Sequence, residues 1–325
     1  MDRIPIRRRL PSRLLAPALV VLAIIGCLEA TNRCVLAPAS NDYRSFATYP
    51  GKAATLDGSP GLRVAVVGNS TARSGVDGDG LGRLMTAALG RPVTAGLFVA
   101  DSAEVTTWHF MLRRFFWRPK LRADVVVLLY YGDGLFDSRE PEIGRLAQFF
   151  STAADIPELF RGYLPSLGQR IEYLASAWWM TYAARDRLRE RVLKAVVPDH
   201  ARYSRRVNDW QYAHRPATAA ASQPGFQKLA RLLAEARANG MQVVVVALPT
   251  APSRRYEVPK TLIETVEQAG MTFLDNRIMP GLPPDLFPDG LHLADEGKAI
   301  YTPLLAAELS RLVARQRGPG GTDRE

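Results

Sequence analysis

Short apolar runs rich in valine recur along this chain and alternate with longer segments whose apolar residues follow the spacing of a helix. Runs of four to eight apolar residues bounded by Gly, Pro, Asn or Asp are typical of buried strands. They predict strands at 62–67, 92–99, 123–131, 242–248 and 271–274. The segments with helical spacing predict helices at 81–89, 105–117, 226–238, 261–269 and 296–315. Because strands alternate with helices, we expect a three-layer α/β/α fold with a mostly parallel sheet that helices cover on both faces.

Residues 138–215 interrupt this alternation with amphipathic helical segments rich in arginine, such as 171–196. One interpretation is a helical cap that packs on the edge of the sheet. The other is a surface for a substrate or partner, since Arg and the aromatic pair Trp178-Trp179 suit sugars or acidic polymers. We treat 138–215 as a helical insertion within a domain at 61–316. Residues 35–60, with Pro, Ser, Gly, Asn and Asp and little periodicity, predict a linker, and 317–325 a disordered tail.

The N-terminal region combines a basic segment with an uncharged apolar run at 14–28. As a helix this run spans roughly 22 Å, less than the ~30 Å hydrocarbon core of a bilayer. It therefore predicts a signal h-region or a short signal anchor at 1–34. The sequence Ile24-Ile25-Gly26-Cys27 also resembles a bacterial lipoprotein cleavage box, in which Cys27 is lipidated. Either outcome predicts an inner-membrane tether with the remaining chain in the periplasm, because positive charge stays on the cytoplasmic side.

Charge and cysteine content exclude several classes of function. Of the net charge of +10, the first thirteen residues carry +4. The rest has no long basic run with interleaved aromatics, so we expect no nucleic-acid partner. Two cysteines close together and four scattered His predict neither a disulfide framework nor a metal site, and we expect no cofactor. The glycine-rich run at 75–82 has Leu81 where calcium needs an oxygen ligand, so it predicts a turn before the next helix.

The predicted helix at 105–117 carries an apolar stripe that we expect in the core. Trp108, Met111, Leu112 and Phe115 recur at helical spacing. His109 lies off this stripe, so it is expected on the surface.

Two stretches carry the candidate chemistry. Ser70 follows Gly68-Asn69 directly after the first predicted strand, where a turn opened by glycine would expose a hydroxyl. More than two hundred residues later, Asp289 precedes His292 by three residues. A serine nucleophile needs a base within hydrogen-bond reach, and that base needs a group to orient it. One loop that holds a carboxylate and an imidazole can supply both.

The order Ser, Asp, His also occurs in α/β-hydrolases, and 68–72 nearly matches G-x-S-x-G. However, Ala72 replaces the second glycine and only one strand precedes Ser70. A serine on the first strand and D-x-x-H before the last helix instead resemble the SGNH/GDSL hydrolase superfamily, whose fold is flavodoxin-like. The first block of that superfamily resembles Gly68-Asn69-Ser70 here, and its last block resembles Asp289-Gly290-Leu291-His292.

This resemblance implies Ser70 as nucleophile, His292 as base and Asp289 as the partner that orients the base. The second block of the family supplies a glycine N–H to the oxyanion, and Gly96 or Ala100 could occupy that place. The third block reads G-x-N-D, with Asn as a further donor. Here the chain reads Tyr131-Gly132-Asp133-Gly134, so the Asn is missing and only Asp133 matches the block. Loss of one such donor can lower the rate ~10²–10³-fold.

With its membrane segment, the chain resembles envelope acyl-transfer proteins such as alginate O-acetyltransferase-like and D-alanyl-transfer-like proteins. That resemblance implies an esterase or O-acyltransferase acting on acyl groups, acetyl above all, of an exopolysaccharide or envelope glycan. It also implies partners in envelope biosynthesis. The alternative, motivated by the missing Asn, is a catalytically silent SGNH-like protein that binds glycans or scaffolds an envelope assembly.

Overall fold

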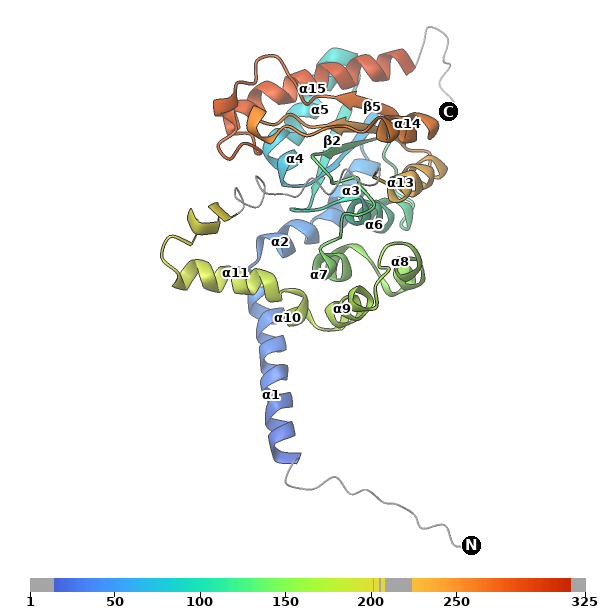
Figure 1. Cartoon of the computed structure of the whole chain (residues 1–325). Helices are drawn as coiled ribbons and strands as arrows, with labels where there is room; N and C mark the ends of the chain where they lie inside the picture. Colours follow the sequence, from blue (N-terminus) through green and yellow to red (C-terminus); the bar gives the residue numbers. More distant parts are fainter. Residues whose placement is uncertain (1–14, 201, 205, 208–223, 317–325) are drawn as a thin grey trace, which may run out of the picture.

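A parallel sheet forms the centre of the protein. The computed structural model describes residues 15–200, 202–204, 206–207 and 224–316 (Figure 1). The five strands follow the order β2-β1-β3-β4-β5, and each neighbouring pair is parallel. This arrangement confirms the predicted fold class. The strands are β1 (Leu62–Gly68), β2 (Val93–Val99), β3 (Val125–Tyr130), β4 (Gln242–Ala247) and β5 (Thr272–Asp275).

Helices cover both faces of the sheet because successive strand residues point to opposite sides. Val64 and Val66 of β1 pack against α5 (Gly78–Leu89) and α15 (Asp295–Gln316), whereas Ala65 and Val67 belong to the core on the other face. That second core includes α6 (Val105–Leu112), α13 (Gln227–Ala238) and α14 (Lys260–Gln268). Figure 1 shows the sheet between these layers.

Residues 35–60 are not the irregular linker that the sequence predicted. They contain α2 (Asn41–Ala47) and α3 (Tyr49–Asp57). Phe46, Tyr49, Ala53 and Leu56 are buried in the core, and the last three recur at helical spacing. The Tyr49 hydroxyl donates to the carbonyl oxygen of Val99 at 2.5 Å and accepts from its N–H at 2.8 Å. The apolar face of α3 thus packs beside the edge strand β2, although Pro and Gly residues occur in and around this helix.

The N-terminal helix is longer than the apolar run that predicted it. The helix α1 (Leu15–Thr31) continues as the π-helical turn η2 (Asn32–Leu36). Among the described residues, one helical stretch, Ala16–Leu36, is long and apolar enough to cross a membrane. Its 21 residues span about 31 Å, close to the ~30 Å of a bilayer core. In Figure 1, α1 projects from the body of the protein.

The insertion is helical through its described part, but 171–196 is not one helix. The chain breaks at Trp179, which adopts an extended conformation (φ −124°, ψ 100°). Leu146, Phe150, Leu159 and Tyr163 of the insertion are buried in the core. Residues 208–215, the basic N-terminal segment and the tail at 317–325 lie outside the described residues. The elements are α7 (Ile143–Arg145), η4 (Leu146–Phe150), η5 (Ala153–Asp155), α8 (Ile156–Gly162), α9 (Leu167–Trp178), α10 (Met180–Ala183) and α11 (Arg185–Val196).

The predicted surface position of His109 is wrong, although the apolar stripe around it is buried as expected. The ring is 1% exposed. Tyr163 donates its hydroxyl to Nδ1 at 2.6 Å, and Nε2 lies 2.7 Å from Oε2 of Glu235. Glu235 also accepts from Arg113, in the π-helical turn η3 (Arg113–Trp117) that ends the predicted helix at 105–117. Polar partners from α13 and the insertion therefore allow this histidine to be buried.

Candidate active site

The start of the helix after β1 places Ser70 at the carboxyl edge of the sheet. The helix α4 (Ser70–Gly75) begins two residues after the strand ends. The Oδ1 atom of Asn69 caps it by accepting the backbone N–H of Thr71 at 3.1 Å and its hydroxyl at 2.6 Å. A methyl group at Gly68 would lie 2.4 Å from the Cβ of Ala72, so glycine permits this close strand-to-helix turn.

The loop before α15 carries Asp289 and His292. Gly290 adopts the left-handed conformation (φ 79°) and lets the chain turn back on itself. The Oδ1 atom of Asp289 accepts the backbone N–H groups of Leu291 at 2.9 Å and His292 at 2.8 Å. The carbonyl oxygen of Gly290 accepts the N–H of Ala251 at 3.1 Å, which ties this loop to the segment after β4.

The structure brings Ser70, His292 and Asp289 into one chain of hydrogen bonds. Nδ1 of His292 lies 2.6 Å from Oδ2 of Asp289, and Nε2 lies 2.8 Å from Oγ of Ser70. A carboxylate only accepts hydrogen bonds, so Nδ1 must carry the proton in this contact. Nε2 of the neutral ring is then free to accept the hydroxyl proton of Ser70. This is the geometry that activates a serine nucleophile.

Local hydrogen bonds keep Asp289 ionised. Partial burial raises the pKa of Asp289, but the backbone N–H and ring of His292 and the N–H of Leu291 outweigh it, so the pKa lies below its ordinary value. The His292 side chain is 35% exposed and the Asp289 side chain 46%, so a large molecule can approach both from solvent.

Across the described residues, no group of three or more His, Cys, Asp or Glu side chains could hold a metal ion.

Neither residue proposed from the second block offers a free N–H beside Ser70. Gly96 lies opposite Ala65 in the middle of strand β2, three residues or about 10 Å before the strand ends. The N–H of Ala100 donates to the carbonyl oxygen of Gly68 at 3.2 Å. Gly96 is therefore distant from Ser70 along its strand, and the N–H of Ala100 is already paired, so neither N–H is placed for the expected oxyanion role.

Gly132 and Asp133 lie in the turn that follows β3, the neighbour of β1 in the sheet. Gly132 has a left-handed backbone (φ 59°), and no heavy atom lies within 4 Å of the position that a Cβ would occupy. The carboxylate of Asp133 lies 3.8 Å from the guanidinium of Arg139, near the start of the insertion. The turn after β3 therefore has open space at Gly132, where the expected third block would carry Asn.

No model of a known protein family matches the chain, and no curated protein matches it by sequence. Among solved structures it is similar to a lipase/acylhydrolase from Enterococcus faecalis, with 15% identity and a TM-score of 0.37 over 77% of this chain and 97% of the other. A GDSL-like lipase from Bacteroides thetaiotaomicron has 12% identity and a TM-score of 0.34 over 82% and 98%. A catalytic mutant of an acetylxylan esterase from Geobacillus stearothermophilus has 14% identity and a TM-score of 0.36 over 81% and 96%. The function of this chain is therefore inferred from its own residues.

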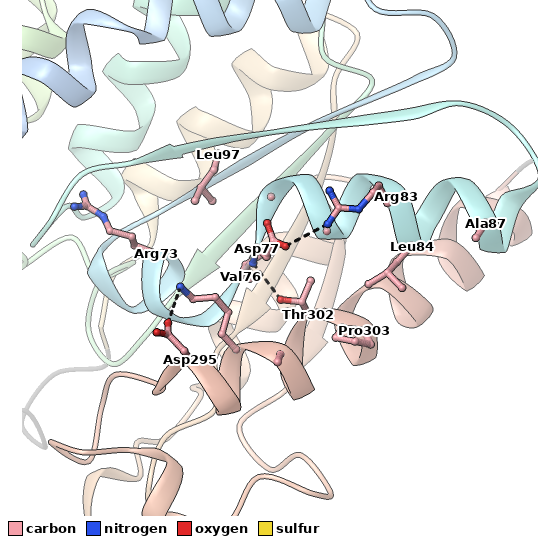
Figure 2. A pocket seen from close by; sticks show the side chains of 14 residues that line it. Arg73, Val76, Asp77, Arg83, Leu84, Ala87, Leu97, Asp295, Thr302 and Pro303 are labelled. Atoms are coloured by element: carbon pink, nitrogen blue, oxygen red, sulfur yellow. Dashed lines mark hydrogen bonds and ion pairs between the residues drawn. The ribbon is translucent and has the colours of Figure 1, made fainter.

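Arg73 lies three residues after Ser70 on α4. Its guanidinium is 3.0 Å from the carboxylate of Asp101. Arg73 also lines a cavity of about 710 Å³ between α4, α5 and α15, together with residues such as Asp295 and Thr302 (Figure 2). Ser70 does not line this cavity, so the candidate nucleophile lies outside it.

Proposed function

We propose that this protein is a serine-dependent esterase or O-acyltransferase, acting through the domain at 61–316. The observation that carries the proposal is the hydrogen-bond chain from Ser70 through His292 to Asp289, with contacts of 2.8 Å and 2.6 Å. These three residues occur in the order and on the elements expected of a nucleophile, a base and an orienting carboxylate.

In the first half of the reaction, Oγ of Ser70 attacks the acyl carbonyl carbon while Nε2 of His292 takes the hydroxyl proton. Asp289 holds the ring by accepting Nδ1–H and stabilises the imidazolium that forms. The tetrahedral intermediate then collapses, its bond to the leaving oxygen breaks, and His292 gives the proton to that oxygen. The acyl group remains on Ser70 as an ester.

In the second half, an acceptor hydroxyl attacks the acyl-enzyme and His292 takes its proton, which then returns to Oγ of Ser70. Water as acceptor makes the protein an esterase, and a sugar hydroxyl makes it a transferase. The partial exposure of His292 suits a bulky acceptor at this step.

The substrate we propose is an acyl ester, above all an acetyl ester, on an exopolysaccharide or envelope glycan. The resemblance to envelope acyl-transfer proteins and the 21-residue helix Ala16–Leu36 support this substrate class. The helix would hold the domain on the periplasmic face of a bacterial inner membrane, as an uncleaved anchor or, with Cys27 lipidated, as a lipoprotein. Partners in envelope biosynthesis belong to the same proposal.

The glycine in place of the expected Asn favours a second candidate function. Without the side-chain amide, an SGNH-like domain can hold the Ser70–His292–Asp289 arrangement and still stabilise an oxyanion poorly. Such a protein would bind glycans or scaffold an envelope assembly without turnover. Gly132 is the specific observation behind this alternative.

Hydrolysis of p-nitrophenyl acetate and acetylated polysaccharide by the full-length protein in detergent separates the two candidates. We expect the wild type to be active and Ser70→Ala to lose activity by ~10³-fold or more. Ser74→Ala is the matched control, because Ser74 lies on the same helix and donates to the Thr71 carbonyl. A fluorophosphonate should label the wild type at Ser70 and fail to label Ser70→Ala. If the wild type is inert, is not labelled and still binds polysaccharide, the enzyme proposal is wrong.

A further inference from the structure

The outward face of α9 is apolar along its whole length. Leu167, Ile171, Leu174 and Trp178 follow the spacing of one helix face and are 72%, 57%, 39% and 83% exposed. We call these four residues the α9 stripe. Single exposed apolar residues are ordinary on a protein surface, but a continuous stripe with two large aliphatic side chains and a tryptophan marks an interaction surface.

The polar residues of α9 point the opposite way, toward the protein. Tyr173 and Ser176 are buried. Arg170 donates to the carbonyl oxygens of Leu164 at 2.9 Å and Phe160 at 2.7 Å, and so is held within the insertion. In water, an amphipathic helix buries its apolar face and exposes its polar face. The helix α9 departs from this pattern, because its exposed face is the apolar one, and such a face suits an apolar medium.

Direct contacts place the end of the α9 stripe beside the end of the membrane helix. Glu29 of α1 accepts the backbone N–H groups of Met180 and Thr181, each at 2.9 Å. Arg33, in the turn that continues α1, donates to the carbonyl oxygen of Trp178 at 3.0 Å. In Figure 1, α9, α10 and α11 lie around the point at which α1 leaves the body. The Trp178 end of the α9 stripe therefore lies beside the C-terminal end of the apolar run of α1.

The charge and residue types around this point suit the surface of a lipid bilayer. Trp is favoured at the boundary between head groups and hydrocarbon because its ring is apolar and its N–H is polar. The neighbouring α11 carries five basic and two acidic residues, and Val192 and Val196 on it are exposed. Arg185 and Arg187 pair with Glu172 and Asp42 of the protein, so the exposed basic residues of α11 are Arg189, Arg191 and Lys194. Basic residues beside a membrane segment attract anionic phospholipids.

We propose that the α9 stripe lies in the head-group region of the bilayer that α1 crosses, with α11 against the anionic phospholipids. The partner of this surface is thus the membrane itself. The insertion then holds the domain in one orientation to the bilayer, in place of a domain that swings freely on its anchor. This inference rests on the proposed membrane helix and is independent of the serine chemistry.

Nitroxide labels on the full-length protein test the proposal. In a background of Cys27→Ser and Cys34→Ser, single cysteines are introduced as Ile171→Cys, Ile278→Cys or Leu22→Cys and then labelled. Each variant is reconstituted in vesicles of phosphatidylethanolamine with a minor share of phosphatidylglycerol. Collision rates with oxygen, which dissolves in lipid, and with a water-soluble nickel chelate are measured by electron paramagnetic resonance. Ile278 is the matched control because it is also an exposed isoleucine (74%) and lies in the segment after β5, away from the insertion.

We expect the ratio of oxygen to nickel collisions to be several-fold higher at position 171 than at position 278, and higher still at position 22 within α1. If position 22 is lipid-exposed but positions 171 and 278 give equal, water-like ratios, the anchor stands and the docking surface is refuted. A protein partner for the stripe would give that same result in pure lipid vesicles. If position 22 is itself water-exposed, both the anchor and the docking surface are refuted, with no consequence for Ser70.

Discussion

Asp289→Asn tests whether the carboxylate of the candidate site orients and stabilises His292 as proposed. The substitution keeps the Oδ1 acceptor, so the backbone N–H groups of Leu291 and His292 at 2.9 Å and 2.8 Å retain their partner. It replaces Oδ2, which lies 2.6 Å from Nδ1 of His292, by an amide group that donates. The ring must then present an N–H to Ser70 at Nε2, or lose its contact with position 289. In both cases the His292 ring is no longer held with an unprotonated Nε2 facing the hydroxyl of Ser70, so it cannot take the proton of that hydroxyl efficiently.

The expected loss follows from the charge that Asp289 stabilises. Two unit charges about 4 Å apart at an effective dielectric constant near 20 interact by about 4 kcal/mol, which corresponds to ~10³-fold in rate. Because the Asp289 side chain is 46% exposed, solvent screens part of this interaction. We therefore expect kcat to fall ~10²–10³-fold, with little change in KM, since the lost interaction forms with the imidazolium of the transition state.

Initial rates of p-nitrophenyl acetate hydrolysis by wild type, Asp289→Asn and Asp285→Asn measure this effect. Asp285 is the matched control because it is exposed, lies on the nearby turn η8 (Pro284–Leu286) and carries the same charge. We expect Asp285→Asn to retain wild-type kcat and thermal midpoint. Asp289→Asn should stay folded with a somewhat lower midpoint, because the lowered pKa of Asp289 means that its charge stabilises the folded state. A folded Asp289→Asn protein with wild-type kcat would refute the proposed role of the carboxylate.

Gly132→Asn should raise kcat by about ten-fold or more if the missing side-chain amide limits the rate. Asn tolerates the left-handed backbone of Gly132, and the space around a Cβ there is open. Unchanged esterase rates in the folded variant would contradict this prediction. Gly68→Ala should lower stability by about 1–3 kcal/mol and reduce activity, since its methyl group would lie 2.4 Å from a side-chain carbon of α4. Its thermal midpoint and esterase rate check both effects, and an unchanged midpoint would show that the turn can relax. Burial raises the pKa of Glu235, but hydrogen bonds from His109 and Arg113 outweigh it and lower the pKa from 4.5 to about 2. The stability that this carboxylate contributes is therefore present above pH 4.5 and is lost as the pH falls toward about 2. Urea unfolding should show Glu235→Gln destabilised at neutral pH, with the difference from wild type closing across that window, whereas a constant difference would exclude the titration.

Local pattern was enough to determine the central layers of this protein. Each strand is a short apolar run bounded by turn residues, so the parallel sheet could be predicted from neighbours along the chain. The candidate residues were found for a similar reason. Ser70 follows a strand directly, and Asp289 lies three residues from His292, so their spacing is itself local.

Tertiary structure alone decided which faces and which distant residues meet. Ser70 and His292 are 222 residues apart, and only the order of strands in the sheet brings their side chains to 2.8 Å. Periodicity marks α9 as amphipathic but does not say which face turns inward; contacts with the insertion and α1 decide that. His109 was misplaced because its burial depends on Tyr163 and Glu235, partners that no local window contains. The spacing of apolar residues determines local secondary structure over a few residues. Burial of a polar group depends instead on hydrogen-bond partners that the whole fold supplies.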